Sequence, residues 1–207
     1  MSDEITTLAE LEALYGTPDP NSLAKVAHKV TPEYAAWIEA ARFAVLSTVG
    51  PAGTDGSPRG DDGPVVQILD AQTVLMPDWR GNNRADSLRN IIEDGRVSLM
   101  FMVPGKTNVI RLNGRATLTR APALMARFRD KSREPRLVIK IVVEEIYSQC
   151  ARALMRAKLW STDDSALALP TMGEILRAQT AGAVDGGAYD DAWAARAAKT
   201  MWSVEKR

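Results

Sequence analysis

Ten consecutive residues, 110–119, alternate between apolar and polar side chains in the order IRLNGRATLT. Strict alternation is the pattern of a β-strand that has one face in a core and the other face outside it. Arg111, Asn113 and Arg115 then lie in a row on the outer face. The sequence therefore predicts a long strand whose polar face carries two arginines and an asparagine.

Five further segments have the β-branched and apolar content of short strands. They are residues 43–49, 65–69, 73–76, 97–103 and 137–143. Residues 50–63 carry Gly, Pro and Asp throughout and are expected to form a loop. Short strands with short connections favour an antiparallel barrel over a parallel sheet with crossover helices. The predicted fold class is therefore α+β, a β-barrel with helices.

Helical spacing of apolar residues and capping signals predict helices on both sides of the strands. The expected segments are residues 8–15, 22–29, 32–41, 121–128, 147–160, 171–179 and 187–202. In the segment 147–160, Gln149, Arg152 and Arg156 would share one helix face. Two arginines four residues apart repel each other mildly, which solvent can absorb or a shared anion can reverse. Trp193 and Trp202 on the last helix need a surface to cover, either the body of the chain or a partner subunit.

The stretch from Asp78 to Asn90, DWRGNNRADSLRN, follows a predicted strand and runs into the helical spacing of Leu88 and Ile91. This order indicates a strand, a tight glycine turn and the start of a helix. Free N–H groups at a helix N-terminus, together with arginines, suit a bound phosphate. A solvated loop that caps an ordinary helix is the alternative interpretation.

Charge and composition narrow the function. The net charge is zero, but residues 78–160 hold 17 Lys and Arg against 8 Asp and Glu, while the rest holds 9 against 18. A basic middle attracts an anionic ligand. Nucleic acid is not expected as a partner, because the basic residues stand singly without interleaved aromatics. No glycine-rich nucleotide-binding motif of the Rossmann or Walker type is present.

The low numbers of cysteine and histidine argue against several other kinds of functional site. Cys150 is the single cysteine and His28 the single histidine, which argues against a disulfide, a zinc site and a Cys–His nucleophile. We expect Cys150 to be a buried small side chain. The absence of a long apolar run predicts no membrane span. The acidic residues 1–16 do not form a secretory signal, and a reducing cytoplasm is the expected location.

Several short motifs, taken in order, resemble those of a known family. They are SPRGD at 57–61, GNNR at 81–84 with DSL at 86–88 and Asn90, the run from Leu99 to Gly105, RLNG at 111–114, and Cys150 with Leu159-Trp160. The combination is similar to the pyridoxamine 5′-phosphate oxidase-related FMN-binding split-barrel proteins, over about residues 8–162. The resemblance implies a six-stranded antiparallel split barrel, a homodimer and one FMN in each of two clefts at the interface.

The resemblance also implies which residues bind the cofactor. They are Arg59, Arg80, Gly81, Asn82, Asn83, Arg84, Ser87, Asn90, Arg111, Asn113, Ser148, Gln149 and Arg152. The split-barrel domain, with the N-terminal helices, would cover residues 1–162, and residues 163–207 would be a C-terminal helical extension. The alternative for Arg111 and Arg115 is a solvated sheet face paired with Glu144 or Glu145. Trp79 and Trp160 could cover a flavin ring or serve as ordinary packing.

Two functions agree with these residues. The first is an FMN-dependent oxidoreductase acting on an unknown small substrate, in which the flavin carries the chemistry and no catalytic residue is visible. The second is a flavin-binding carrier or sensor without turnover. A related split barrel that binds haem or a deazaflavin is a third interpretation, although the lone His28 argues against a histidine-ligated haem. Oxidation of pyridoxamine phosphate itself is not expected, because no substrate clamp is recognisable.

Overall fold

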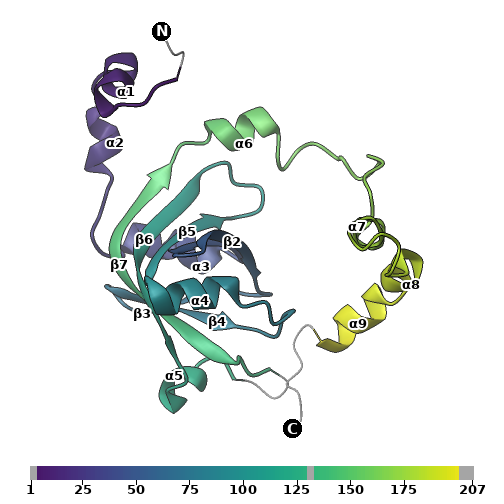
Figure 1. Ribbon diagram of the computed structural model, residues 1–207. Helices are drawn as coiled ribbons and strands as arrows, with labels where there is room; N and C mark the ends of the chain where they lie inside the picture. The colour runs from purple at the N-terminus through teal and green to yellow at the C-terminus, as the bar shows by residue number, and fades with distance from the viewer. Residues whose placement is uncertain (1–3, 130–132, 201–207) are drawn as a thin grey trace.

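The computed structural model describes residues 4–129 and 133–200, and one antiparallel sheet of seven strands lies at its centre (Figure 1). The strands are β1 (Phe43–Gly50), β2 (Gly53–Gly60), β3 (Gln67–Asp70), β4 (Thr73–Asp78), β5 (Arg96–Met102), β6 (Val109–Thr119) and β7 (Leu137–Gln149). Their order across the sheet is β2-β1-β5-β6-β7-β4-β3. The prediction of an antiparallel α+β fold is confirmed.

Helices lie before, within and after the run of strands. They are α1 (Leu8–Tyr15), α2 (Pro20–Ala24), α3 (Pro32–Ala40), α4 (Asp86–Glu93), α5 (Pro122–Met125), α6 (Arg152–Ala157), α7 (Met172–Gln179), α8 (Gly186–Asp191) and α9 (Trp193–Thr200). The helix expected at 32–41 begins as predicted, because the Thr31 side chain caps its first turn and a proline occupies the first helical position.

The two longest strands, β6 and β7, form the middle of the sheet, and β6 confirms the prediction made from the alternation at 110–119. The pairing shifts register between Asn113 and Gly114. A Cβ on Gly114 would lie 2.1 Å from the Val142 carbonyl oxygen, so no side chain fits there. Such a bulge bends a strand and increases its twist, and it curls the sheet around the core.

The number of strands is seven, so the prediction of six was wrong. Residues 53–60, expected to lie in a loop, form β2 and pair with the whole of β1. A two-residue turn joins the strands between Gly50 and Gly53, and Gly53 has a φ of 121° that a side chain would disfavour. Pro58 is tolerated because β2 is an edge strand, where a missing N–H need not break a ladder.

Other boundaries also differ from the predictions. Tyr147 to Gln149, expected to be helical, extend β7, because the matching residues of β6 continue the hydrogen-bond ladder as far as the pair Val109 and Gln149. The second helix ends at Ala24, since Ala27 pairs with Ile146 as an isolated bridge. The tail helix expected at 187–202 is two helices, α8 and α9, and Trp202 lies outside the described residues.

One apolar core lies on the concave side of the sheet, and α3 and α4 close it. Its fully buried large side chains include Ile38, Leu46, Leu99, Phe101, Leu112, Ile139, Ile141 and Ile146. Burial of this kind stabilises a fold by about 1.5–3 kcal/mol for each large apolar side chain. The core therefore fixes which face of each strand is inside, and that decides where the predicted site residues lie.

Two segments stand away from the barrel (Figure 1). No residue of α1 or α2 is buried. Helices α7 and α8 cross so closely that a Cβ on Gly173 would lie 2.0 Å from the Gly186 carbonyl oxygen. Trp193 remains 56% exposed, so the described residues cover less than half of it. Within residues 4–129 and 133–200, every helix is too short or too polar to span a bilayer.

Candidate functional site

The predicted cofactor residues fall on two faces of the sheet. Arg59 is paired across strands with the buried Ala44, and cross-strand partners point to the same side, so Arg59 lies on the core face. Helix α4, which carries Ser87 and Asn90, also packs on the core. Arg111 alternates with the buried Leu112 and therefore points to the opposite, outer face.

We call Arg59, residues 80–84, Ser87 and Asn90 the inner set. Its centre is the ion pair between Arg59 Nη1 at the end of β2 and Asp78 Oδ1 at the end of β4, which are 2.6 Å apart. The two side chains are only 17% and 13% exposed. The buried Nε of Arg59 has no hydrogen-bond partner among the described residues. One buried donor of this guanidinium therefore lacks an acceptor in the described part of the chain, which is costly for a polar group away from water.

Beside this ion pair lies a second polar contact between the ends of β2 and β4. Trp79 Nε1 donates to Asp61 Oδ2 at 2.9 Å, and the Arg133 guanidinium carbon lies 6.0 Å from the Trp79 ring centroid. Burial raises the pKa of the Asp61 carboxyl, and the neighbouring Asp62 raises it further. Trp79 is half-buried and held by its indole N–H, which gives the inner set a fixed aromatic ring.

The turn at 80–84 crosses from β4 to α4 and is held by its own side chains. The Asn82 side chain accepts from the Arg84 amide at 3.1 Å, and the Asn83 side chain accepts from Arg136. The left-handed residues here are Asn83 and Ala85, with φ of 66° and 58°, so the prediction of a turn made by Gly81 was wrong. Asparagine adopts this conformation readily.

The start of α4 differs from a simple anion site. Ala85 occupies the N-cap position without a side-chain cap, and Asp86 lies in the first turn. The Asp86 carboxylate pairs with the exposed Arg84. A carboxylate in the first turn of a helix already satisfies much of the positive end of its dipole. An anion at this turn would therefore compete with Asp86 for Arg84.

Ser87 and Asn90 are buried and support the turn by holding α4 on the first hairpin. The Ser87 hydroxyl donates to Asp55 on β2, and Asn90 Nδ2 donates to Thr48 Oγ1 at 3.1 Å. The close approach requires Gly50, since a Cβ there would lie 2.4 Å from Asn90 Oδ1. A hollow of about 390 Å³ lies between the hairpin and α4. Its lining includes residues 52–55, Arg84, Asp86, Arg89, Asn90 and Glu93.

We call Arg111 and Asn113, with their neighbour Arg115, the outer row. The Arg111 guanidinium carbon lies 5.3 Å from the ring centroid of Tyr147 on β7. Asn113 Nδ2 donates to Glu145 Oε1 at 2.6 Å, and Arg115 pairs with Glu144 at 3.4 Å. The expected alternative, a sheet face paired with Glu144 or Glu145, thus describes Asn113 and Arg115, whereas Arg111 stacks on an aromatic ring.

The last predicted residues follow along β7 and into α6. Ser148 is half-buried on the side of Ile110, Gln149 is exposed at the end of the strand, and Arg152 is exposed at the start of α6. The shared helix face expected for Gln149 and Arg152 was wrong, because Gln149 belongs to the strand. Cys150 is exposed, not buried as expected, and a hydrogen bond from the Arg152 amide lowers the pKa of its thiol.

The structure therefore places the inner set in two groups, with Arg59 beside Asp78 at the end of β2 and with Arg84, Ser87 and Asn90 at the hairpin end of α4. The outer row lies on the other face of the sheet. Sequence reasoning missed Asp78 as the partner of Arg59, and it missed Arg133 and Arg136. A signal for Asp78 was present, because the residue lies two positions after the strand predicted at 73–76, at the start of the basic stretch. Nothing local indicated Arg133 or Arg136, whose contacts are 53 or more positions away.

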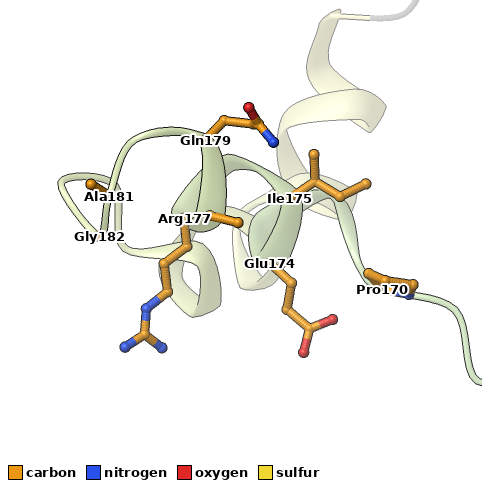
Figure 2. A pocket seen from close by; sticks show the side chains of 8 residues that line it. Pro170, Glu174, Ile175, Arg177, Gln179, Ala181 and Gly182 are labelled. Atoms are coloured by element: carbon orange, nitrogen blue, oxygen red, sulfur yellow. The ribbon is translucent and has the colours of Figure 1, made fainter.

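A second hollow lies elsewhere. It is a shallow, open depression of about 690 Å³ along α7 and the turn after it, between Pro170 and Gly182 (Figure 2). The residues that Figure 2 labels belong to α7 and the segments on either side of it, and none is a predicted cofactor residue. Among the described residues, no group of three or more His, Cys, Asp or Glu could hold a metal ion.

A curled antiparallel sheet flanked by helices, with charged side chains at the open ends of its strands, defines the class of split-barrel proteins. Solved structures to which the chain is similar include a HupZ protein of group A Streptococcus (19% identity, TM-score 0.48, 57% of this chain and 93% of the other). A second is described as a putative pyridoxamine 5′-phosphate oxidase of Lactobacillus delbrueckii (18%, 0.47, 58% and 95%). A third is an FMN-binding protein of Syntrophomonas wolfei (17%, 0.42, 69% and 92%).

No curated protein matches the sequence. The family model described as pyridoxamine 5′-phosphate oxidase matches residues 30–150. The chain belongs to this family, as the sequence motifs predicted. The matched range contains every predicted cofactor residue except Arg152.

Proposed function

We propose that this protein binds FMN and acts as an FMN-dependent oxidoreductase on a small substrate, as a homodimer with the flavin between the subunits. Membership of the pyridoxamine 5′-phosphate oxidase family supports the proposal. The observation that carries it is the buried Arg59 Nε, a cationic donor without a partner among the described residues. A buried donor of this kind is costly unless a ligand satisfies it.

The inner set fits a flavin phosphate. Arg59 and Arg84 would supply charge-assisted hydrogen bonds to the phosphate oxygens, and Arg80 and residues 81–83 would supply further donors. Ser87 and Asn90 would keep α4 seated so that the turn holds its shape. Trp79 would cover the edge of the ring. The bound flavin supplies the electron-transfer chemistry, and the chain provides binding, orientation and exclusion of water.

The homodimer explains the outer row. Arg111 and Asn113 cannot reach the inner set of their own chain, because the sheet lies between them. The outer face also carries Phe43, Val45, Met100 and Met102, which are half-buried in the single chain. An apolar sheet face with a polar edge is typical of a subunit interface. In the proposed dimer, the outer row, with Ser148, Gln149 and Arg152, would approach the inner set of the second chain at the edge of the interface.

The binding step can be tested by titrating FMN into the protein and following quenching of flavin fluorescence. In Arg84→Ala we expect FMN binding to weaken by more than about tenfold, since a charge-assisted contact is worth about 1.5–3 kcal/mol. The matched control is Arg120→Ala, which removes an exposed arginine outside both sets. FMN should also raise the melting temperature of the wild-type protein by mass action.

Two results of this titration would change the proposal. Unchanged affinity in Arg84→Ala would move the phosphate away from the turn at 80–84. A wild-type protein that neither quenches FMN fluorescence nor gains thermal stability from FMN would end the flavin proposal, and haem and deazaflavin would then be tested in the same way.

A flavin carrier without turnover is the second candidate. The carboxylates in contact with the inner set and Trp79 are each held by a hydrogen bond or an ion pair, so the described residues offer no evident proton-transfer group there. They are Asp55, Asp61, Asp78 and Asp86. Photoreduction of the bound flavin followed by mixing with electron acceptors separates the two. Rapid reoxidation supports the enzyme, and inertness to every acceptor supports the carrier. Cytoplasmic location and a boundary between residues 162 and 163 stay predictions.

A further inference from the structure

Residues 4–24, which we call the acidic arm, form α1, α2 and their connections, and every one of them is exposed. The arm contains four acidic residues and no Lys or Arg. It also exposes large apolar side chains, including Leu8 at 76% and Tyr15 at 77%. Contiguous exposed apolar residues of this kind usually mark a surface that binds something.

The arm gains little stability from packing on the described residues of its own chain. Thr7 and Glu10 form a capping box at the start of α1, so the sequence encodes this helix locally. A helix of eight residues is nevertheless marginal in water without packing on an apolar surface. The arm therefore requires a surface that is both apolar and basic.

The segment Arg152–Trp160, which we call the α6 patch, has these properties. It carries Arg152, Arg156 and Lys158, and no acidic residue occurs between positions 146 and 162. Met155 is 62% exposed, and Leu159 and Trp160 are also exposed. None of the three cations forms an ion pair with any described residue of the same chain. The indole N–H of Trp160 donates to the Lys106 carbonyl at 2.7 Å, which holds the patch in place.

The arm and the patch flank the same end of β7. Ala27 exchanges two backbone hydrogen bonds with Ile146, of 2.9 and 2.7 Å, and the Tyr34 hydroxyl donates to the Lys25 carbonyl at 2.6 Å. These contacts hold residues 25–27, which follow the arm, next to Ile146. Ile146 lies six positions before α6 begins at Arg152. The large apolar residues of the arm and the patch nevertheless remain exposed within one chain, and Figure 1 shows α1 and α6 apart from each other.

We propose that the acidic arm of one chain packs on the α6 patch of a second copy, and that the exchange is reciprocal. This inference rests on the homodimer of the proposed function. In a two-fold dimer the same pair of surfaces meets twice, so complementary charge on one chain is enough for both contacts. The arm would then close over the end of β7 near Ser148 and Gln149, beside the proposed flavin site.

The negative charge of the acidic arm favours the α6 patch of a second copy over a membrane or a nucleic acid as its binding surface. An acidic arm is repelled by the anionic lipids of a membrane surface and by the phosphates of nucleic acid. The α6 patch, in contrast, offers cations and apolar side chains together. Each chain thus contains both halves of the contact.

Photo-cross-linking tests the contact directly. In Cys150→Ser, Leu14→Cys provides a single thiol on α1, which is labelled with a maleimide benzophenone and illuminated. The expected product is a covalent dimer whose cross-link maps to residues 152–160. The matched control carries Ala123→Cys on α5 instead and should give no such dimer. A mixture of tagged and untagged chains proves that the link joins two copies.

Charge reversal tests the energetics by sedimentation at several protein concentrations. Glu12→Lys and Arg156→Glu should each weaken the dimer by about two- to tenfold, as expected for two exposed ion pairs. The combined variant should recover most of the wild-type affinity, because the reversed charges again face each other. Glu39→Lys, on the exposed side of α3, is the control of equal charge change and should have no effect.

The outcomes separate this inference from the flavin proposal. A dimer that binds FMN but gives no cross-link at 152–160 and no recovery in the combined variant overturns the arm contact alone. Cross-linking and recovery without FMN binding support the arm contact and overturn the flavin. A chain that stays monomeric at every concentration overturns the arm contact and the interface site together.

Discussion

The inner set and the outer row contain similar residues but differ in how their charges are satisfied. In the inner set, Arg59 has one close counter-ion, Asp78, and a buried Nε without a partner among the described residues. In the outer row, Asn113 and Arg115 are matched to Glu145 and Glu144 on the adjacent strand. The inner set thus contains a buried hydrogen-bond donor without an acceptor in the described ranges, whereas the outer row is a set of cross-strand pairs.

The difference shows how a ligand site can be recognised among polar residues. Cross-strand pairs on an exposed face stabilise a sheet by a few tenths of a kcal/mol to about 1 kcal/mol each and need no ligand. A buried, incompletely paired guanidinium costs stability in the free protein. The free protein can carry this loss of stability at a site where a bound ligand supplies the missing partner. We therefore propose the inner set as the ligand site, and the outer row would contribute only if a second chain presents it.

The largest effect is expected from Asp78→Asn, which leaves the Arg59 guanidinium buried without a counter-ion. We expect a loss of about 3 kcal/mol in the free energy of unfolding, measured with urea, because breaking a buried ion pair strands a charge. Glu145→Gln, the matched change in the outer row, should cost less than about 1 kcal/mol.

Saturating FMN should reduce the deficit of Asp78→Asn, since a phosphate would replace the missing carboxylate. Equal losses in Asp78→Asn and Glu145→Gln would erase the distinction between the two groups. A deficit that FMN leaves unchanged would remove Arg59 from the phosphate site.

Subunit mixing gives the next effect, about tenfold in FMN affinity. Arg59→Ala and Arg111→Ala should each weaken every site in their own homodimers. In a mixed dimer, one of the two sites would contain both substitutions. The other site would contain the intact Arg59 of one chain and the intact Arg111 of the other chain. After random exchange, roughly a quarter of all sites should bind as tightly as wild type. Recovery of no tight sites in a titration of the mixture would place both arginines in sites built from one chain.

The sequence predicted the parts of the fold whose signal is local. The alternation at 110–119 reports one buried face and was confirmed as β6. Residues 53–60 lack any such signal, because glycine, proline and aspartate disfavour strands. They form β2 only because the edge of β1 offers a complete ladder to a segment that follows a two-residue turn. Tertiary pairing overrides propensity here, and no local pattern reports it.

The candidate site was predictable in the kinds of residues but not in their arrangement. Motif order indicated Arg59, the turn at 80–84 and Arg111. The partners were hidden, since Asp78 is 19 positions from Arg59 and Arg136 is 53 positions from Asn83. The sequence also could not show that Arg59 and Arg111 lie on opposite faces. The side on which Arg59 lies follows only once residues 53–60 are known to form a strand.

The smallest effect is expected at Asp94, which lies between the inner set and the outer row. Asp94 follows α4, and its carbonyl oxygen accepts a hydrogen bond from Arg115 at 3.3 Å. Hydrogen bonds from the Arg96 side chain lower the pKa of Asp94 from 3.8 to about 2. A carboxyl whose pKa is lower in the folded state contributes stability that is fully present above about pH 4 and is lost as the pH falls toward 2. Urea unfolding at pH 5 and pH 2.5 should therefore show a smaller acid-induced loss in Asp94→Asn than in wild type. The control is Asp164→Asn, an exposed carboxylate between α6 and α7, which should keep the wild-type loss. Identical losses in Asp94→Asn and wild type would show that the Asp94–Arg96 pair does not couple the end of α4 to β5 in solution.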